Sequence, residues 1–104
     1  MSDADITQLQ LLQQNLQNIL VQKQQFQKQL AELNSALKEI ETSETTYKIL
    51  GNIMVAAKKD NLQKELTGKK ELLDLRLKNF DKQEKTLNEK TEELQKKVMA
   101  EMKK

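Results

Sequence analysis

The side chains that could do chemistry in this 104-residue chain are few in kind, because the sequence contains no histidine and no cysteine. The usual nitrogen and sulfur ligands of zinc and related metals are therefore missing, and we expect no metal site and no cofactor. Carboxylates such as Asp81 and Glu84 could in principle act as general acids or bases. They stand in a helical pattern, however, without a glycine-rich loop or a paired nucleophile and base. The pattern favours a protein that is not an enzyme and has no catalytic residue.

The composition indicates long helices rather than an ordinary globular core. Charged residues make up 33% of the chain and hydrophobic residues 37%, while aromatics are only 3% and proline is absent. The net charge is +2, with acidic and basic residues interspersed, so we expect no nucleic-acid partner. The polar, acidic beginning of the chain and the lack of an apolar run near the roughly 20 residues of a membrane span predict a cytoplasmic protein without a membrane partner.

The first segment, residues 3–42, has the heptad pattern of a coiled-coil helix. Apolar residues alternate at spacings of three and four, and nine of ten seam positions are apolar. Ser2 followed by Asp5 forms a plausible capping box at its start. The seam positions, a and d alternately, are Leu9, Leu12, Leu16, Ile19, Lys23, Phe26, Leu30, Leu33, Leu37 and Ile40.

A second helix is predicted over residues 60–103, beginning with Asp60 as its cap. Its d positions are all apolar, whereas its a positions are mixed. Because the two helices have nearly equal lengths, we expect them to fold back on each other as an antiparallel coiled coil. The d row is Leu66, Leu73, Phe80, Leu87 and Leu94, and the a row is Lys70, Leu77, Glu84, Thr91 and Val98.

Two polar residues interrupt these seams and could recognise each other. Antiparallel alignment places Lys23 and Glu84 in adjacent layers, and we predict an ion pair that fixes the register more than it adds stability. The alternative is that the Lys23 ammonium reaches past the seam into water.

Between the helices, residues 45–58 lose the helical period and are rich in β-formers. Gly51-Asn52 is a two-residue turn with glycine first, as a type II′ turn requires. This turn would pair Leu50 with Ile53, Ile49 with Met54, Lys48 with Val55 and Tyr47 with Ala56.

Both faces of this hairpin are mostly apolar. A lone two-stranded hairpin is marginal in water, and the rest of the chain is committed to the helices. We therefore expect other chains to complete the sheet. The predicted oligomer interface is Tyr47, Ile49, Leu50, Gly51, Asn52, Ile53, Met54 and Val55.

Two coiled-coil helices around such a hairpin resemble the prefoldin family. The motif Tyr47-Lys48-x-x-Gly51 and the strand Ile53-Met54-Val55 are similar to the hairpin of the family's beta-type subunit. The segments 75–77, 81–85 and 87–90 are similar to its second helix. The resemblance implies a mainly α fold in which residues 1–104 form one domain: a long antiparallel two-helix coiled coil, joined by a single β-hairpin that oligomerises into a β-barrel.

The resemblance also implies a function and partners. The family forms a hexamer of two alpha-type and four beta-type subunits that holds unfolded polypeptides at the coiled-coil tips. It passes them to a group II chaperonin without nucleotide or metal. An expected role for this chain is thus an ATP-independent chaperone subunit.

The tip distant from the hairpin would contain both termini and the client-binding residues. Apolar residues there are Ile6, Leu9, Leu11, Leu12, Val98, Met99 and Met102, and methionine adapts to many partner shapes. For Leu9, Leu12 and Val98, packing in the seam is at least as good an interpretation. The alternative function, which shares the fold, is an oligomeric coiled-coil scaffold or tether that binds one specific folded partner.

Overall fold

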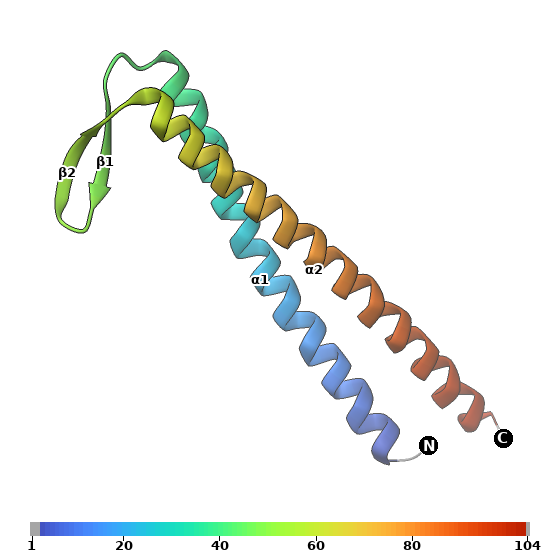
Figure 1. Ribbon diagram of the computed structural model, residues 1–104. Coiled ribbons are helices and arrows are strands. Elements are labelled where there is room, and N and C mark those ends of the chain that lie inside the picture. The colour runs from blue at the N-terminus through green and yellow to red at the C-terminus, as the bar shows by residue number, and fades with distance from the viewer. Residues whose placement is uncertain (1–2, 104) are drawn as a thin grey trace. The chain divides into compact units, whose positions relative to one another are not determined.

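In the computed structural model, which describes residues 3–103, two long helices are joined by a β-hairpin (Figure 1). Helix α1 is Asp3–Thr42, strands β1 and β2 are Thr46–Leu50 and Ile53–Ala57, and helix α2 is Lys59–Met102. The predicted mainly helical fold with one hairpin between two helices is thereby confirmed for the described residues. The predicted capping residue Ser2 lies outside them.

The chain forms two compact units, and each is built from parts of both helices. The terminal unit comprises Met1–Gln25 and Leu77–Lys104, and the hairpin unit is Phe26–Arg76. The first therefore contains the ends of the chain and the second contains the whole β-hairpin.

The heptad pattern correctly predicts which helical residues are shielded from solvent. None of the twenty predicted seam positions is exposed in the structure. The best-buried hydrophobic residues are Leu12 and Val98 in the terminal unit and Ile40 and Leu73 in the hairpin unit, and all four are seam residues. In the hairpin unit the guanidinium carbon of Arg76 also lies 5.6 Å from the centre of the Phe26 ring, an arrangement in which a cation contacts an aromatic face. Packing of the apolar seam is thus what holds each pair of helical segments together.

The second helix begins at Lys59, one residue earlier than predicted. The amide of Leu62 donates a hydrogen bond to the carbonyl oxygen of Lys58, 3.0 Å away, which makes Lys58 the capping position. The expectation that Asp60 caps the helix is therefore wrong. Its carboxylate instead lies in the first turn, where the positive end of the helix dipole still favours a negative charge.

The end of α1 is satisfied by side chains. The hydroxyl of Ser43 donates to the carbonyl oxygen of Glu39 at 2.7 Å, and the ammonium of Lys59 donates to that of Glu41 at 2.8 Å. The last carbonyl groups of a helix have no partners within it. The Lys59 bond therefore also links the end of α1 to the start of α2, from which the hairpin projects.

The hairpin has the predicted register. Leu50 pairs with Ile53, Ile49 with Met54, and the pairing continues to Thr46 and Ala57. Gly51 has a φ of +60°, and no other described residue has a positive φ, so only the first turn residue is left-handed, as a type II′ turn requires.

Candidate assembly and client-binding surfaces

The hairpin exposes large apolar side chains on both of its faces. All eight residues of the predicted oligomer interface are exposed in the isolated chain. Their six large apolar side chains are between 42% and 69% exposed; they are Tyr47, Ile49, Leu50, Ile53, Met54 and Val55. Alternation along a strand places Ile49 and Met54 on one face, and Leu50 and Ile53 on the other. Neither face is covered by the described part of this chain.

An ion pair holds the hairpin against the second helix. The ammonium of Lys48 in β1 donates hydrogen bonds to both carboxylate oxygens of Glu65 in α2, at 2.8 and 3.0 Å. These bonds hold the pKa of the Glu65 carboxyl below its ordinary value, since they favour its charged form. This contact was not among the predictions from the sequence. The available signal was Lys48 itself, a lone cation on an otherwise apolar hairpin face.

In the terminal unit, the predicted client-binding residues fall into two groups. Leu12 and Val98 are only 8% exposed and pack in the seam, while Ile6 and Leu9 are half-buried. Three residues present their side chains to solvent: Leu11 at 55%, Met99 at 58% and Met102 at 68%. The alternative interpretation of Leu9, Leu12 and Val98 as seam residues therefore describes the positions of Leu12 and Val98, while Leu9 is half-buried; the exposed members of the predicted set are Leu11, Met99 and Met102.

The polar residues of the seam meet in the terminal unit. The ammonium of Lys23 lies 3.0 Å from a carboxylate oxygen of Glu84 and 2.7 Å from one of Asp81. Hydrogen bonds to Asp81 and Glu84, in that order of importance, raise the pKa of Lys23 above its ordinary value. The predicted pair of Lys23 and Glu84 is therefore present, and Asp81 is a second partner that was not predicted. Its position three residues before Glu84 was the available signal, because residues three apart share a helix face.

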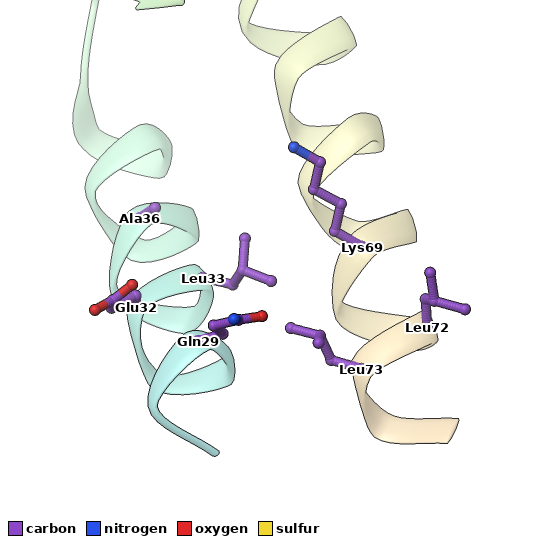
Figure 2. A pocket seen from close by; sticks show the side chains of 7 residues that line it. All are labelled: Gln29, Glu32, Leu33, Ala36, Lys69, Leu72 and Leu73. Carbon is purple, nitrogen blue, oxygen red and sulfur yellow. The ribbon is translucent and has the colours of Figure 1, made fainter. Parts of the chain in front are cut away.

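An open groove runs between the two helices of the hairpin unit. It has a volume of about 450 Å³ and is lined by Leu33 and Ala36 of α1 and by Lys69, Leu72 and Leu73 of α2, among others. Figure 2 shows Leu33 and Leu73 pointing toward each other between the helices, whereas Leu72 points away from α1. A second groove, under strand β1, shares Ala36 and Lys69 with the first. The two grooves therefore lie next to each other.

The described residues contain no group of three or more carboxylate, histidine or cysteine side chains that could hold a metal ion. Within residues 3–103, neither helix is apolar enough over a sufficient length to cross a membrane.

Comparison with known proteins places these features in a family. A family model described as "Prefoldin subunit" matches residues 3–104. The prefoldin subunit beta of Sulfurisphaera tokodaii is 41% identical over 96 residues, which cover 89% of this chain and 77% of the relative. That of Archaeoglobus fulgidus is 42% identical over 96 residues, covering 89% and 83%.

A solved structure agrees. The crystal structure of the prefoldin beta subunit from Thermococcus strain KS-1 matches with a TM-score of 0.88 and 40% sequence identity, over 93% of this chain and 88% of that one. This chain belongs to the prefoldin family, whose members are chaperones and not enzymes. Within the family it is of the beta type, as the predicted resemblance indicated.

Proposed function

We propose that this chain is a beta-type subunit of a cytoplasmic hexamer of two alpha-type and four beta-type prefoldin subunits, whose hairpins assemble into β-barrels. The observation that carries the proposal is the hairpin with six exposed large apolar side chains on its two faces. A monomer gains nothing by keeping such a surface in water, and unpaired strand edges readily accept further strands. Hairpins of neighbouring subunits would cover the apolar faces and pair with the strand edges.

Native mass measurement of the chain, alone and with an alpha-type prefoldin subunit, tests this assembly. We expect hexamers in the mixture, and we expect the variant with Ile49→Asp and Met54→Asp to form none, because it places charges on one apolar face. A matched control with Gln13→Asp and Gln14→Asp, at exposed positions of α1, keeps assembling. Hexamers of normal stability in the hairpin variant would contradict the proposal.

The assembled protein holds non-native polypeptide at its tips without ATP. Support comes from Leu11, Met99 and Met102, which lie near the chain ends within the terminal unit and are exposed. Thioether side chains are flexible and polarizable, so a methionine-containing surface adapts to exposed apolar segments of unrelated proteins. Ile6 and Leu9 of the same unit are half-buried, and Leu12 and Val98 are buried in the seam.

Suppression of aggregation separates this function from that of a scaffold. The assembled hexamer should keep several unrelated denatured proteins soluble without ATP, whereas a scaffold that binds one folded partner should have no effect. Removing residues 1–10 and 96–104 should abolish the effect with the hexamer intact. Unchanged holding by the trimmed protein would exclude the tips as the client-binding site.

The held polypeptide then passes to a group II chaperonin. A prefoldin surface that binds through a few apolar side chains releases its client easily, which suits transfer. The test is refolding of a client that has been bound to the hexamer beforehand, with group II chaperonin and ATP added. A large excess of an inactive chaperonin, which captures free client without refolding it, is added as a trap. Direct transfer predicts that native client is still recovered in the presence of this trap. Equal loss of recovery with and without prefoldin argues against direct delivery.

A further inference from the structure

Helix α2 has a short apolar stripe on the side opposite its seam. With Leu73 at d and Leu77 at a, Leu72 and Leu75 occupy the outward positions c and f of one heptad. Their side chains are 53% and 56% exposed. The other c and f positions of α2, from Glu65 to Lys103, hold polar or small residues. Outward positions of a two-helix coiled coil are ordinarily polar. The pairing of α1 with α2 therefore does not explain these two leucines.

The stripe lies beside the surface used for assembly. In the hairpin unit, the large apolar side chains that are exposed are those of the hairpin together with Leu72 and Leu75. Leu72 is among the residues that line the groove between the helices, although its side chain points away from α1 (Figure 2). Lys69 and Ala36 of this groove also line the one under β1, where Ile49 is part of the lining. Leu75, three residues after Leu72 on the same helix face, lines neither groove. A partner chain that covers Ile49 on the groove side of β1 would therefore also contact Lys69 and, beyond it, Leu72.

The hairpin alone is small for a stable interface. Its two strands contain five residues each, whereas a stable protein interface uses roughly 20 to 30 residues on each side. Further contact surface on the hairpin unit is therefore needed, and the two adjoining grooves and the leucine stripe on α2 provide apolar surface next to the hairpin.

We propose that the neighbouring prefoldin subunit in the assembly extends from the hairpin of this chain past the edge of the two grooves and onto the outward face of α2, where it covers Leu72 and Leu75. Apolar side chains of the neighbour's own hairpin are the contacting groups, since that element carries the exposed apolar residues of a beta-type chain. This inference rests on the proposed assembly and adds a second contact site to it, on helix α2 rather than on the sheet.

The absence of cysteine from the sequence permits a direct test. Single variants Leu72→Cys and Leu75→Cys are labelled with a maleimide, first as the isolated chain and then in the hexamer formed with an alpha-type subunit. The control is Val21→Cys, an apolar, exposed residue at an outward position of α1 in the terminal unit. We expect labelling of both leucine positions to slow about tenfold or more on assembly, as burial in an interface requires, and that of position 21 to stay unchanged. Undiminished labelling of position 72 in a verified hexamer would overturn the inference.

A second variant measures the energetic contribution. Leu72→Gln with Leu75→Gln keeps helix propensity nearly constant, and we expect the hexamer to dissociate at about tenfold higher concentration, because apolar contact area is lost. The unfolding temperature of the isolated chain should not change, since both side chains are exposed there. Normal assembly of this variant, with clients held less well, would instead assign the stripe to client binding and contradict the inference.

The hairpin variant with Ile49→Asp and Met54→Asp separates this inference from the proposed function. If it fails to assemble while the Leu72 and Leu75 variant assembles normally, the hairpin interface stands and the second contact site is excluded. If the unmodified chain forms no assembly with any alpha-type subunit, both proposals are wrong.

Discussion

At the scale of single residues, the polar cluster in the seam shows how a coiled coil can exclude alternative alignments. Lys23 reaches two carboxylates, those of Asp81 and Glu84, at 2.7 and 3.0 Å. A shift of one helix along the other would bring the ammonium against apolar seam residues and leave both carboxylates without their partner. Ion pairs that are partly removed from water contribute little net stability but discriminate strongly between registers. We therefore predict that the cluster determines the register more than it adds stability.

Replacing the pair by leucines tests this role. The double variant Lys23→Leu with Glu84→Leu should unfold a few degrees higher than the original chain, since well-packed apolar residues commonly replace such pairs without loss. It should also populate more than one alignment, seen as additional sets of amide signals in NMR spectra. A single set of signals together with a higher unfolding temperature would show that the cluster does not determine the register.

The two glycines should respond in opposite directions to the same substitution. Gly68 is an exposed helical residue with open space around its Cβ position, so Gly68→Ala should stabilise the isolated chain by about 0.5–1 kcal/mol. Gly51 has a φ of +60°, which a side chain opposes, so Gly51→Ala should destabilise it by about 1 kcal/mol. Chemical denaturation followed by circular dichroism measures both. A destabilising effect of Gly68→Ala would show that this position is not simply solvated.

At the scale of elements, the β-hairpin is attached to its own chain by polar contacts and leaves its apolar surface for partners. Lys48 binds Glu65 in α2, and the hydroxyl of Thr46 donates to the carbonyl oxygen of Ala57 at 2.7 Å, which closes the open end of the two strands. These contacts use polar groups of the hairpin, so its large apolar side chains remain exposed. The hairpin is thus positioned before assembly, which reduces the entropy lost on binding.

This attachment predicts a pH dependence. Because the folded-state pKa of Glu65 is lowered by Lys48, its contribution to stability is present above the unfolded-state pKa of about 4.3 and is lost as the pH falls through the folded-state value. The unfolding temperature of the original chain should exceed that of Glu65→Gln at pH 7. This difference should shrink as the pH falls below about 4.3 and disappear below the folded-state pKa of Glu65.

The control for the pH series is Glu71→Gln, which alters an exposed carboxylate of the same helix. Its effect on the unfolding temperature should be small at every pH. A difference between the original chain and Glu65→Gln that persists unchanged at pH 3 would mean that the carboxylate acts through packing rather than through its charge.

At the scale of the whole molecule, the two surfaces of proposed function belong to different units of the chain. The hairpin unit carries the proposed assembly surface, and the terminal unit carries the exposed apolar residues Leu11, Met99 and Met102. Such a division allows a change in client binding without a change in assembly. It also allows seam residues of the terminal unit to be distinguished experimentally from client-binding residues.

The triple variant Leu11→Gln, Met99→Gln and Met102→Gln tests the client surface. It should lose most of the ability to suppress aggregation while keeping its helix content and its hexameric state, since the three side chains are exposed and glutamine is a good helix former. Aggregation assays with two unrelated denatured proteins measure the loss.

The matched comparison is Leu12→Ala, in the seam of the same unit. Because Leu12 is 8% exposed, its truncation should destabilise the chain by about 2 kcal/mol or more. A triple variant that holds clients normally would exclude these residues as the binding surface, and a triple variant that loses stability as Leu12→Ala does would assign them to packing.

The sequence by itself determined the helices, their seams and the hairpin. Heptad spacing requires only local periodicity, so every predicted seam residue is shielded, including the polar Lys23 and Glu84. The register of the hairpin follows from a two-residue turn that permits a positive φ at Gly51. The sequence also indicated which family the chain resembles, because the turn and the flanking strands combine in one short motif.

Only the tertiary structure decided which side chains around these elements meet or remain exposed. Lys48 contacts Glu65 and Lys23 contacts Asp81 because of the directions in which long side chains leave their elements, which heptad letters do not specify. The separation of buried Leu12 and Val98 from exposed Leu11, Met99 and Met102 likewise depends on packing between segments distant in the sequence. Sequence periodicity predicts which face of a helix a residue lies on. The exposure of that residue also depends on what packs against that face, which is determined only when the chain has folded.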